Sequence, residues 1–325
     1  MPLIDLPLDE LRVFRPDVAE PADFDAFWDT TISETRSQDL SPVFTPAETP
    51  VRFGTVLDVS FGGWAGDRIA AWLILPPGDD PVGCVVRYIG YGGGRGRPQH
   101  HLAFPAAGWA TLVMDSRGQG SQSTTMSGVT GDPHGTDNPA VPGVMTRGIT
   151  DPATYYYRRL FADAYRAVDV ALRHPRVDNQ RIVVAGNSQA GALAQAMGAL
   201  HPYVAAALID VPFLSHIRRG AEIAQAGPYL EIGAYLASHR LEEERTFDTL
   251  SYFDGVNFAR RGAVPALYSV GLMDRVVPPS TVFAAYNRWV GEKRIEVWPW
   301  NGHEGGETTQ WETQCAFLSD LLGRP

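Results

Sequence analysis

The chain has 325 residues, of which 44% are hydrophobic and 20% charged, so it can bury a large core without disulfides. Its 27 basic and 37 acidic residues give a net charge of −10, which argues against nucleic acid and anionic membranes as partners. No apolar run reaches the length of a membrane span, the N-terminus lacks the basic region of a signal peptide, and Cys84 and Cys315 are the only cysteines. We therefore expect a cytoplasmic globular protein whose two cysteines are buried hydrophobic side chains.

The first third of the chain predicts a helix and then a β-hairpin. Apolar residues at three-to-four spacing predict the helix over 17–36, with Pro21 in its first turn. Two β-like runs, 51–60 and 68–75, flank the turn-rich segment 62–67 and predict the hairpin. We therefore expect the sheet to begin with antiparallel strands.

The rest of the chain alternates strand-like and helical runs. Strands are predicted over 82–89, 111–114, 181–185, 204–209, 263–270 and 294–298, and helices over 155–173, 190–200 and 308–322. This alternation predicts an α/β fold with a mostly parallel central sheet and helices on both faces. The segment 116–150 has no periodicity, and we interpret it either as a structured functional loop or as a part of the chain where the element prediction fails.

A serine lies where a strand-like run passes directly into a helix of small residues. The segment 181–191 reads RIVVAGNSQAG, so Ser188 stands in a G-x-S-x-A pattern. A sharp turn of this kind exposes the serine above the sheet, as in the nucleophile elbow G-x-S-x-G. Ala190 replaces the second glycine of that pattern but is still small. We expect Ser188 to be a nucleophile, and the alternative is a serine in an ordinary strand-to-helix turn.

Candidate partners for the serine follow it in the order acid and then histidine, which is the order of α/β-hydrolase triads. Asp274 comes just after the strand-like run 263–270, and His303 follows a glycine after the last such run. We expect Asp274 to be the acid and His303 the base. Asp210, which also ends a strand-like run, is the rival acid, and the alternative for His303 is an exposed turn histidine.

Other titratable residues fit this scheme less well. His100 and His101 form an adjacent pair, but they lie upstream of the serine and therefore break the order of the triad. Asp163 and Asp169 lie in a predicted helix, and we interpret them as surface or capping charges.

A glycine-rich segment after an early strand, 88–96, can supply a backbone N–H group to an oxyanion. We expect the N–H of Tyr91 to be one donor and the N–H of Gln189, the residue after the serine, to be the other. The segment does not read G-x-G-x-x-G in any register and has no P-loop lysine, which argues against a nucleotide site.

Three motifs resemble one known family. Arg117-Gly118-Gln119-Gly120, Gly186-Asn187-Ser188-Gln189 and His303-Glu304 are similar, in this order, to the signature of carbohydrate esterase family seven, the acetyl xylan esterases and cephalosporin C deacetylases. The segments 148–159, 210–219, 250–258 and 271–286 also resemble that family, so the similarity extends over nearly the whole chain.

The resemblance implies an α/β-hydrolase fold, no cofactor or metal, and a cytosolic homohexamer. It implies hydrolysis of acetyl esters of small alcohols, including acetylated xylo-oligosaccharides and cephalosporin C. By position, Ser188, Asp274 and His303 correspond to the family's triad, and Tyr91 and Gln189 to its oxyanion donors. The Arg117 motif corresponds to a structural brace beneath the active site, and Tyr91 and Pro228 to contacts with the substrate near the acyl group.

We expect residues 1–325 to form a single α/β-hydrolase domain. The segment 1–50 is predicted to be an N-terminal helical extension, and 213–258 a helical insertion that acts as a cap or an oligomer contact. Rival functions are a serine peptidase or a longer-chain esterase or lipase on the same fold, and a catalytically silent binding protein. The complete, ordered triad argues against the last of these.

Overall fold

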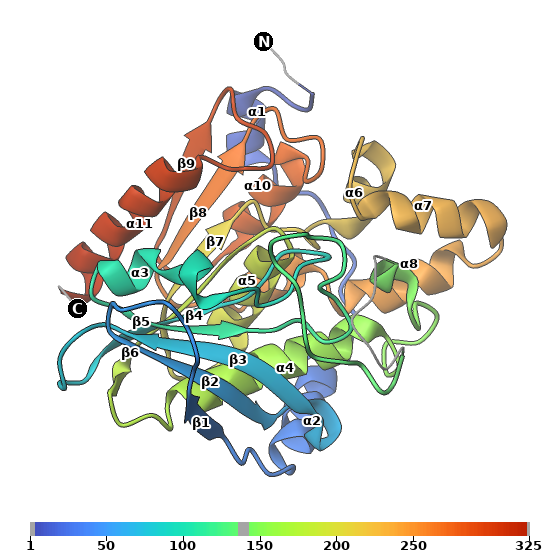
Figure 1. Ribbon diagram of the computed structural model, residues 1–325. Helices are drawn as coiled ribbons and strands as arrows, with labels where there is room; N and C mark the ends of the chain where they lie inside the picture. The colour runs from blue at the N-terminus through green and yellow to red at the C-terminus, as the bar shows by residue number, and fades with distance from the viewer. Residues whose placement is uncertain (1–3, 136–142, 324–325) are drawn as a thin grey trace.

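The computed structural model describes residues 4–135 and 143–323, and the strands of this part form one sheet (Figure 1). The strands are β1 (Val43–Pro46), β2 (Thr55–Gly62), β3 (Arg68–Leu75), β4 (Val82–Arg87), β5 (Ala110–Met114), β6 (Val177–Asn187), β7 (Val204–Asp210), β8 (Ala266–Gly271) and β9 (Lys293–Trp298). Their spatial order is β1-β2-β3-β5-β4-β6-β7-β8-β9. Pairing is antiparallel from β1 to β5 and parallel from β5 to β9, which confirms the predicted mostly parallel sheet with an antiparallel start.

Helices cover both faces of the sheet (Figure 1). They are α1 (Leu8–Val13), α2 (Phe24–Arg36), α3 (Ala103–Ala106), α4 (Tyr156–Ala171), α5 (Gln189–Leu200), α6 (Ile217–Ile223), α7 (Tyr229–Ser238), α8 (Glu243–Ser251), α9 (Gly255–Ala259), α10 (Pro279–Arg288) and α11 (Glu307–Leu322). Neighbouring strand residues point to opposite faces, so Val86 packs in the core beside α4 and α5, whereas Val85 packs beneath α3 and α11. Both faces of the central strands are therefore apolar.

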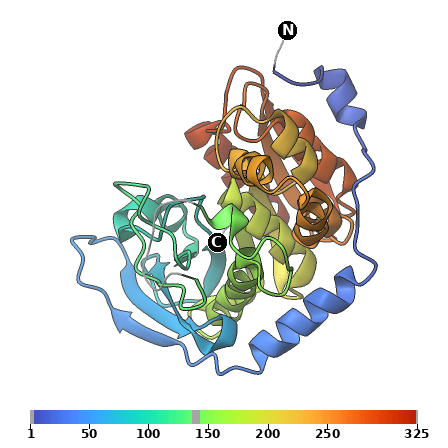
Figure 2. The same cartoon turned by 90° about the vertical axis from the view of Figure 1, so that its right-hand side faces the viewer.

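The N-terminal helix is shorter than predicted. It begins at Phe24 instead of at residue 17, and Pro21 lies before it, with its carbonyl accepting the Phe24 N–H at 3.1 Å. The preceding residues are held by tertiary contacts, since the carbonyls of Val18 and Ala19 accept hydrogen bonds from Arg260 and Asn257. Figure 2 shows this N-terminal segment, in blue, along the outside of the helices between α1 and α2. Local periodicity could not reveal these distant partners.

Two further segments differ from their predicted limits. The hairpin forms, but its first strand is β2 over 55–62 instead of 51–60, and a short 3-10 turn over 64–66 joins it to β3. Within 213–258 the chain makes α6, α7, α8 and the greater part of α9. The segment 1–50 also supplies β1 to the edge of the sheet. The N-terminal part is therefore not wholly helical.

One carboxylate holds the part of the segment 116–150 around residues 129 and 130. Asp115, at the end of β5, accepts hydrogen bonds from the backbone N–H groups of Arg95, Val129 and Thr130 at 2.8 to 2.9 Å. It also accepts one from the Thr130 hydroxyl at 2.9 Å. The part of this segment over 136–142 lies outside the described residues. The described part is a structured loop, tied to the end of a central strand.

The two cysteines differ in exposure. Cys84 is fully buried in β4, as predicted, and burial raises the pKa of its thiol to about 12. Cys315, on α11, is only half-buried, which differs from the prediction, and burial raises its pKa to about 11. Both are free thiols.

Candidate active site

Ser188 lies at the turn between β6 and α5, with φ 61° and ψ −124°. This conformation is strained for a residue with a side chain, and hydrogen bonds on both sides hold it. The Ser188 N–H donates to the Asp210 carbonyl at 3.0 Å, and the Ser188 carbonyl accepts from the N–H groups of Ala192 and Phe213 at 3.0 and 3.1 Å. The turn therefore fixes the serine at the carboxyl end of the central strands.

The turn requires small residues around the serine. A Cβ atom on Gly186 would lie 2.3 Å from the Ala190 Cβ, and one on Gly191 would lie 2.6 Å from the Asp210 carbonyl oxygen. Both contacts are far shorter than van der Waals distance, so α5 can approach β6 and β7 only because these positions are glycine. The methyl group of Ala190 is fully buried in the space that Gly186 leaves free. The alanine in the G-x-S-x-A pattern therefore fits without displacing the helix.

Asp274 and His303 lie together at the ends of neighbouring strands. Asp274 follows β8 and is fully buried, and its Oδ1 accepts the N–H groups of Val276 and Val277 at 2.8 and 2.9 Å. Its Oδ2 lies 2.8 Å from Nδ1 of His303, which follows β9. A carboxylate in this place holds the proton on Nδ1, so that Nε2 is the nitrogen left to accept a proton.

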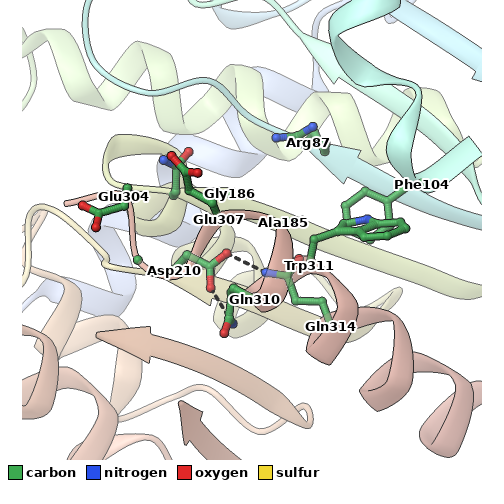
Figure 3. A pocket seen from close by; sticks show the side chains of 12 residues that line it. Arg87, Phe104, Ala185, Gly186, Asp210, Glu304, Glu307, Gln310, Trp311 and Gln314 are labelled. Carbon is green, nitrogen blue, oxygen red and sulfur yellow. Dashed lines mark hydrogen bonds between the residues drawn. The ribbon is translucent and has the colours of Figure 1, made fainter. Parts of the chain in front are cut away.

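The carboxylate of the rival acid, Asp210, contacts α11 (Figure 3). Its two carboxylate oxygens accept the side-chain amides of Gln310 and Gln314, both on α11, at 2.9 and 2.5 Å. Burial raises the pKa of Asp210 to about 6. Of the two candidate acids, the one that contacts His303 is therefore Asp274.

The glycine-rich loop and the start of α5 are joined by one glutamine. Gln119 accepts the Gly92 N–H through Oε1 at 2.6 Å, and its Nε2 donates to Gln189 Oε1 at 3.0 Å and to the Tyr156 hydroxyl at 2.8 Å. Gln189 in turn donates from Nε2 to the Ile89 carbonyl at 3.1 Å. Gln119 therefore fixes the segment that carries Tyr91 relative to the residue after the serine.

The backbone N–H groups of Tyr91 and Gln189 are both available. Within the described ranges, no protein acceptor takes a hydrogen bond from either N–H group. Gln189 is the first residue of α5, where N–H groups have no partner inside the helix. Tyr91 lines the same cavity as Ser188 and Gln189 directly follows the serine, so both N–H groups are candidate donors to an oxyanion.

Arg117 is a buried cation surrounded by carboxylates. Its Nε and Nη2 donate to the two oxygens of Asp163 at 2.5 and 2.9 Å, and its Nη1 donates to Asp67 at 2.9 Å and to Asp132 at 3.3 Å. Although burial opposes it, this surrounding charge holds the pKa of Arg117 above its usual value. Asp163 is fully buried, so its interpretation as a surface or capping charge was wrong. A helical pattern gives no sign that one polar position faces a cation from another segment.

The other residues of the Arg117 motif have structural places as well. Gly118 and Gly120 have φ of 64° and 104°, and between them Gln119 turns inward toward Gln189. Asp169, in contrast, retains some exposure and lies 3.4 Å from Arg166 of its own helix. Only one of the two helical aspartates is therefore part of the buried network.

Ser188 and His303 open into one cavity of about 460 Å³, which Tyr91 and Pro228 also line. Pro228 is buried and precedes α7, so the segment 213–258 supplies one wall. Glu231 of α7 accepts the Tyr91 hydroxyl at 2.6 Å, and that hydroxyl accepts the N–H groups of Gly143 and Val144 at 3.0 Å. Sequence reasoning missed Glu231, because no local motif marks it and its partner lies 140 residues away.

The histidine pair lies outside this arrangement. His101 is buried and its Nε2 lies 2.8 Å from the Arg95 carbonyl, and burial lowers its pKa to about 3. A neutral histidine in this setting stabilises the loop over 95–101. Across residues 4–135 and 143–323, no group of three or more His, Cys, Asp or Glu side chains has an arrangement that suits a metal ion. In the same ranges, no helix combines the length and apolar character needed to cross a membrane.

Known proteins of similar sequence and structure are acetyl esterases and acetyl xylan esterases. An acetyl esterase of Xylanibacter ruminicola, Axe7A, is 28% identical over 94% of this chain and 69% of its own length. An acetyl xylan esterase from Paenibacillus sp. R4 is 36% identical, with a TM-score of 0.90 over 98% of this chain and 100% of that one. Acetyl xylan esterase 1 from Thermoanaerobacterium sp. JW/SL YS485 is 35% identical, with a TM-score of 0.86 over 98% and 99%.

The fold is that of the α/β hydrolases, to which the structurally similar proteins belong. The model of the acetyl xylan esterase family matches residues 1–321, which is nearly the full length of the sequence. With this match and these two similar structures, the chain belongs to the acetyl xylan esterase family.

Proposed function

We propose that the protein is a serine carboxylesterase that removes acetyl groups from small acetylated substrates through an acyl-enzyme. The observation that carries the proposal is the 2.8 Å contact between His303 Nδ1 and the buried Asp274, in a cavity that Ser188 also lines. Membership of the acetyl xylan esterase family supports the same class of reaction.

In the acylation step, Nε2 of His303 takes the proton of the Ser188 hydroxyl as its oxygen attacks the acetyl carbonyl. The N–H groups of Tyr91 and Gln189 stabilise the oxyanion, and loss of one such donor costs about 2.7 to 4 kcal/mol. Asp274 stabilises the imidazolium that forms at His303. The proton then passes from Nε2 to the alcohol oxygen, the carbon–oxygen bond of the ester breaks, and the alcohol leaves.

In the second step, His303 takes a proton from water, and the water oxygen attacks the acetyl group on Ser188. Collapse of this intermediate releases acetate and returns the proton to the serine. A short acyl group fits the walls of the cavity. Pro228 is buried, and Tyr91 is tethered through its hydroxyl to Glu231. We expect these two side chains to limit the length of the acyl group.

The substrates we propose are acetylated xylo-oligosaccharides, cephalosporin C and simple acetate esters. The sequence resemblance is the basis for cephalosporin C and for a homohexamer, and light scattering on the purified protein tests the oligomer. Both cysteines are free thiols, as is typical of proteins in the reducing cytoplasm, and the cytoplasm is our proposed location.

The test compares substrates and one matched variant. Esters of 4-nitrophenol with acetate, butyrate and longer acids, together with a peptide anilide, separate an acetyl esterase from a longer-chain esterase, a lipase or a peptidase. We expect hydrolysis to be fastest with acetate and absent with the anilide. Ser188→Ala should abolish turnover while the fold is kept, whereas Ser215→Ala, at a buried serine outside the site, serves as the control. Equal turnover in both variants would exclude the proposed nucleophile.

A further inference from the structure

A second cavity, which we call the Arg87 cavity, lies between the ends of the central strands and α11 (Figure 3). It has a volume of about 380 Å³, at the low end of the range for small-molecule sites. Arg87 at the end of β4 lies on one side of it, and Asp210 with Gln310 and Gln314 on the other. Phe104 and Trp311 lie together in one part of its wall, with ring centroids 6.2 Å apart. Glu304 and Glu307 line it as well.

Arg87 is the unusual member of this set. Among the residues that the structure describes, none forms a hydrogen bond or an ion pair with its guanidinium. Burial lowers its pKa, and the charge of Asp210 opposes that effect. Two other arginines show the contrast, since the fully buried Arg117 contacts Asp163 and Arg159 contacts Asp132. A guanidinium that lines a cavity without such a partner has donors left for a ligand.

The Arg87 cavity adjoins the catalytic cavity through Asn187. This residue directly precedes the serine, and it lines both cavities. A third cavity of about 340 Å³ has Arg87, Asn187 and Tyr91 in its wall, so the three spaces meet around one side chain. Glu304 and Gly305, which follow His303 directly, also line the Arg87 cavity.

The proposed mechanism places the departing alcohol on the side of the site where His303 lies. In the proposed mechanism, His303 must give its proton to the departing alcohol oxygen, so the alcohol leaves on the side of the histidine loop. That loop continues into the wall of the Arg87 cavity at Glu304. An alcohol larger than the catalytic cavity therefore extends toward Arg87.

The polar groups of the cavity select the chemistry of the ligand. The carboxylates of Asp210, Glu304 and Glu307 would repel an anion, and the guanidinium of Arg87 would repel a cation. A neutral hydroxyl group both donates and accepts, so it can bond to the guanidinium and to a carboxylate in the same space. The apolar faces of Phe104 and Trp311 suit the C–H surface of a ring.

From these observations we propose that the Arg87 cavity binds the alcohol portion of the ester, and that its ligand is a neutral polyhydroxylated ring, such as a sugar unit attached to the acetylated one. Arg87 and Glu307 are the residues that recognise its hydroxyl groups. The inference rests on the proposed function, because it assumes that the ester is cleaved at Ser188.

The test measures a selectivity ratio, which is kcat/KM for acetylated xylobiose divided by kcat/KM for 4-nitrophenyl acetate. A hydrogen bond to a charged group contributes enough for Arg87→Met to lower this ratio about tenfold, chiefly through KM of the disaccharide. Arg173→Met is the matched control. It replaces an exposed arginine after α4, at the opposite end of the strands, and should keep the wild-type ratio.

Two further measurements extend the test, and the first of them does not need the Arg87→Met variant. Glu307→Gln changes an exposed position and should also lower the ratio. Unacetylated xylobiose should inhibit hydrolysis of 4-nitrophenyl acetate by the wild-type enzyme, and Arg87→Met should weaken that inhibition about tenfold. A folded Arg87→Met enzyme with an unchanged ratio and unchanged inhibition would overturn the assignment of the cavity. A wild-type enzyme that fails to cleave 4-nitrophenyl acetate would overturn the proposed function itself.

Discussion

At the scale of single residues, the site depends on polar groups that are fixed before a substrate arrives. The strained backbone of Ser188 is held by three hydrogen bonds to its own N–H and carbonyl groups. The carboxylate of Asp274 accepts two backbone N–H groups in addition to its contact with His303. Such groups do not have to reorganise as charge develops, which is the main source of catalytic power in sites of this kind.

The choice of acid can be tested directly. Asp274→Asn should lower kcat by up to about 10⁴-fold, because an amide no longer stabilises the correct tautomer and charge of His303. Asp210→Asn should cost much less, because the Asp210 carboxylate contacts Gln310 and Gln314. Steady-state kinetics on 4-nitrophenyl acetate compares the two variants. A larger loss at Asp210 would exchange their roles.

A buried carboxylate outside the site predicts a pH effect on stability. Asp254 accepts the N–H groups of His216, Ile217 and Val256, and burial raises its pKa to about 6. Its pKa is raised in the folded state, so the folded protein holds a proton that the unfolded chain has lost between about pH 4 and pH 6. This group therefore contributes less stability as the pH rises through that window, by about 3 kcal/mol in total.

Urea unfolding at pH 4 and pH 7 measures this effect. The amide of Asp254→Asn cannot ionise, so the variant should be more stable relative to the wild type at pH 7 than at pH 4. The measured quantity is the free energy of unfolding of the variant minus that of the wild type, and it should be larger at pH 7. The control is Asp248→Asn, at an exposed position of α8. If the free energies of unfolding of Asp254→Asn and the wild type differ by the same amount at pH 4 and at pH 7, the pKa of Asp254 is not raised.

At the scale of secondary structure, the sequence predicts most elements and misplaces some of their ends. The apolar runs of β5 and β8 are buried on both faces, and such runs are easy to recognise. The start of α2 was predicted too early, because contacts with Arg260 and Asn257 keep the preceding residues out of the helix. The short α1 was not predicted, and its packing against α10 depends on residues far along the chain.

The candidate site was predictable to the extent that its residues follow local rules. Ser188, Asp274 and His303 each follow a strand, and the carboxyl ends of parallel strands meet at one edge of a sheet. Glu231 carries no such signal, and although Asn187 and Arg87 end the strands β6 and β4, no local rule shows that they line a cavity. The cavities that these residues line form only where α7, α11 and the loops pack against the ends of the strands, which local patterns in the sequence do not show.

The link between the glycine-rich loop and α5 can be tested at Gln119. Gln119→Met removes the hydrogen bonds to Gly92 and Gln189 at similar side-chain volume. We expect kcat to fall about tenfold to 100-fold with a smaller change in KM, because Gln119 positions oxyanion donors and does not touch the substrate. Gln180→Met, at an exposed position, is the control. An increase in KM alone would mean that Gln119 acts in binding.

At the scale of the whole molecule, the Arg117 network joins parts that are distant in the sequence. Asp67 lies in the β2–β3 turn, Asp132 in the loop after β5, and Asp163 on α4. Arg159 also contacts Asp132, at 2.7 Å. The network therefore fastens the antiparallel start of the sheet to the helix that covers its centre.

Removal of this cation should destabilise the whole fold. Arg117→Met leaves the buried Asp163 without its cationic partner, and the free energy of unfolding should fall by about 3 to 5 kcal/mol. Arg218→Met breaks an exposed ion pair with Glu243 and should cost no more than about 1 kcal/mol. Urea unfolding at neutral pH compares them. An equal fall in the free energy of unfolding of both variants would mean that the buried ion pairs of Arg117 stabilise the fold no more than an exposed ion pair does.

The central claim is that Ser188 carries the acetyl group during turnover. The most direct measurement is mass spectrometry of protein quenched by acid during hydrolysis of 4-nitrophenyl acetate, followed by digestion and sequencing of the modified peptide. The account predicts one acetyl group on Ser188 and no acetylated peptide from Ser188→Ala. An acetyl group on another residue, or continued turnover by Ser188→Ala, would contradict it.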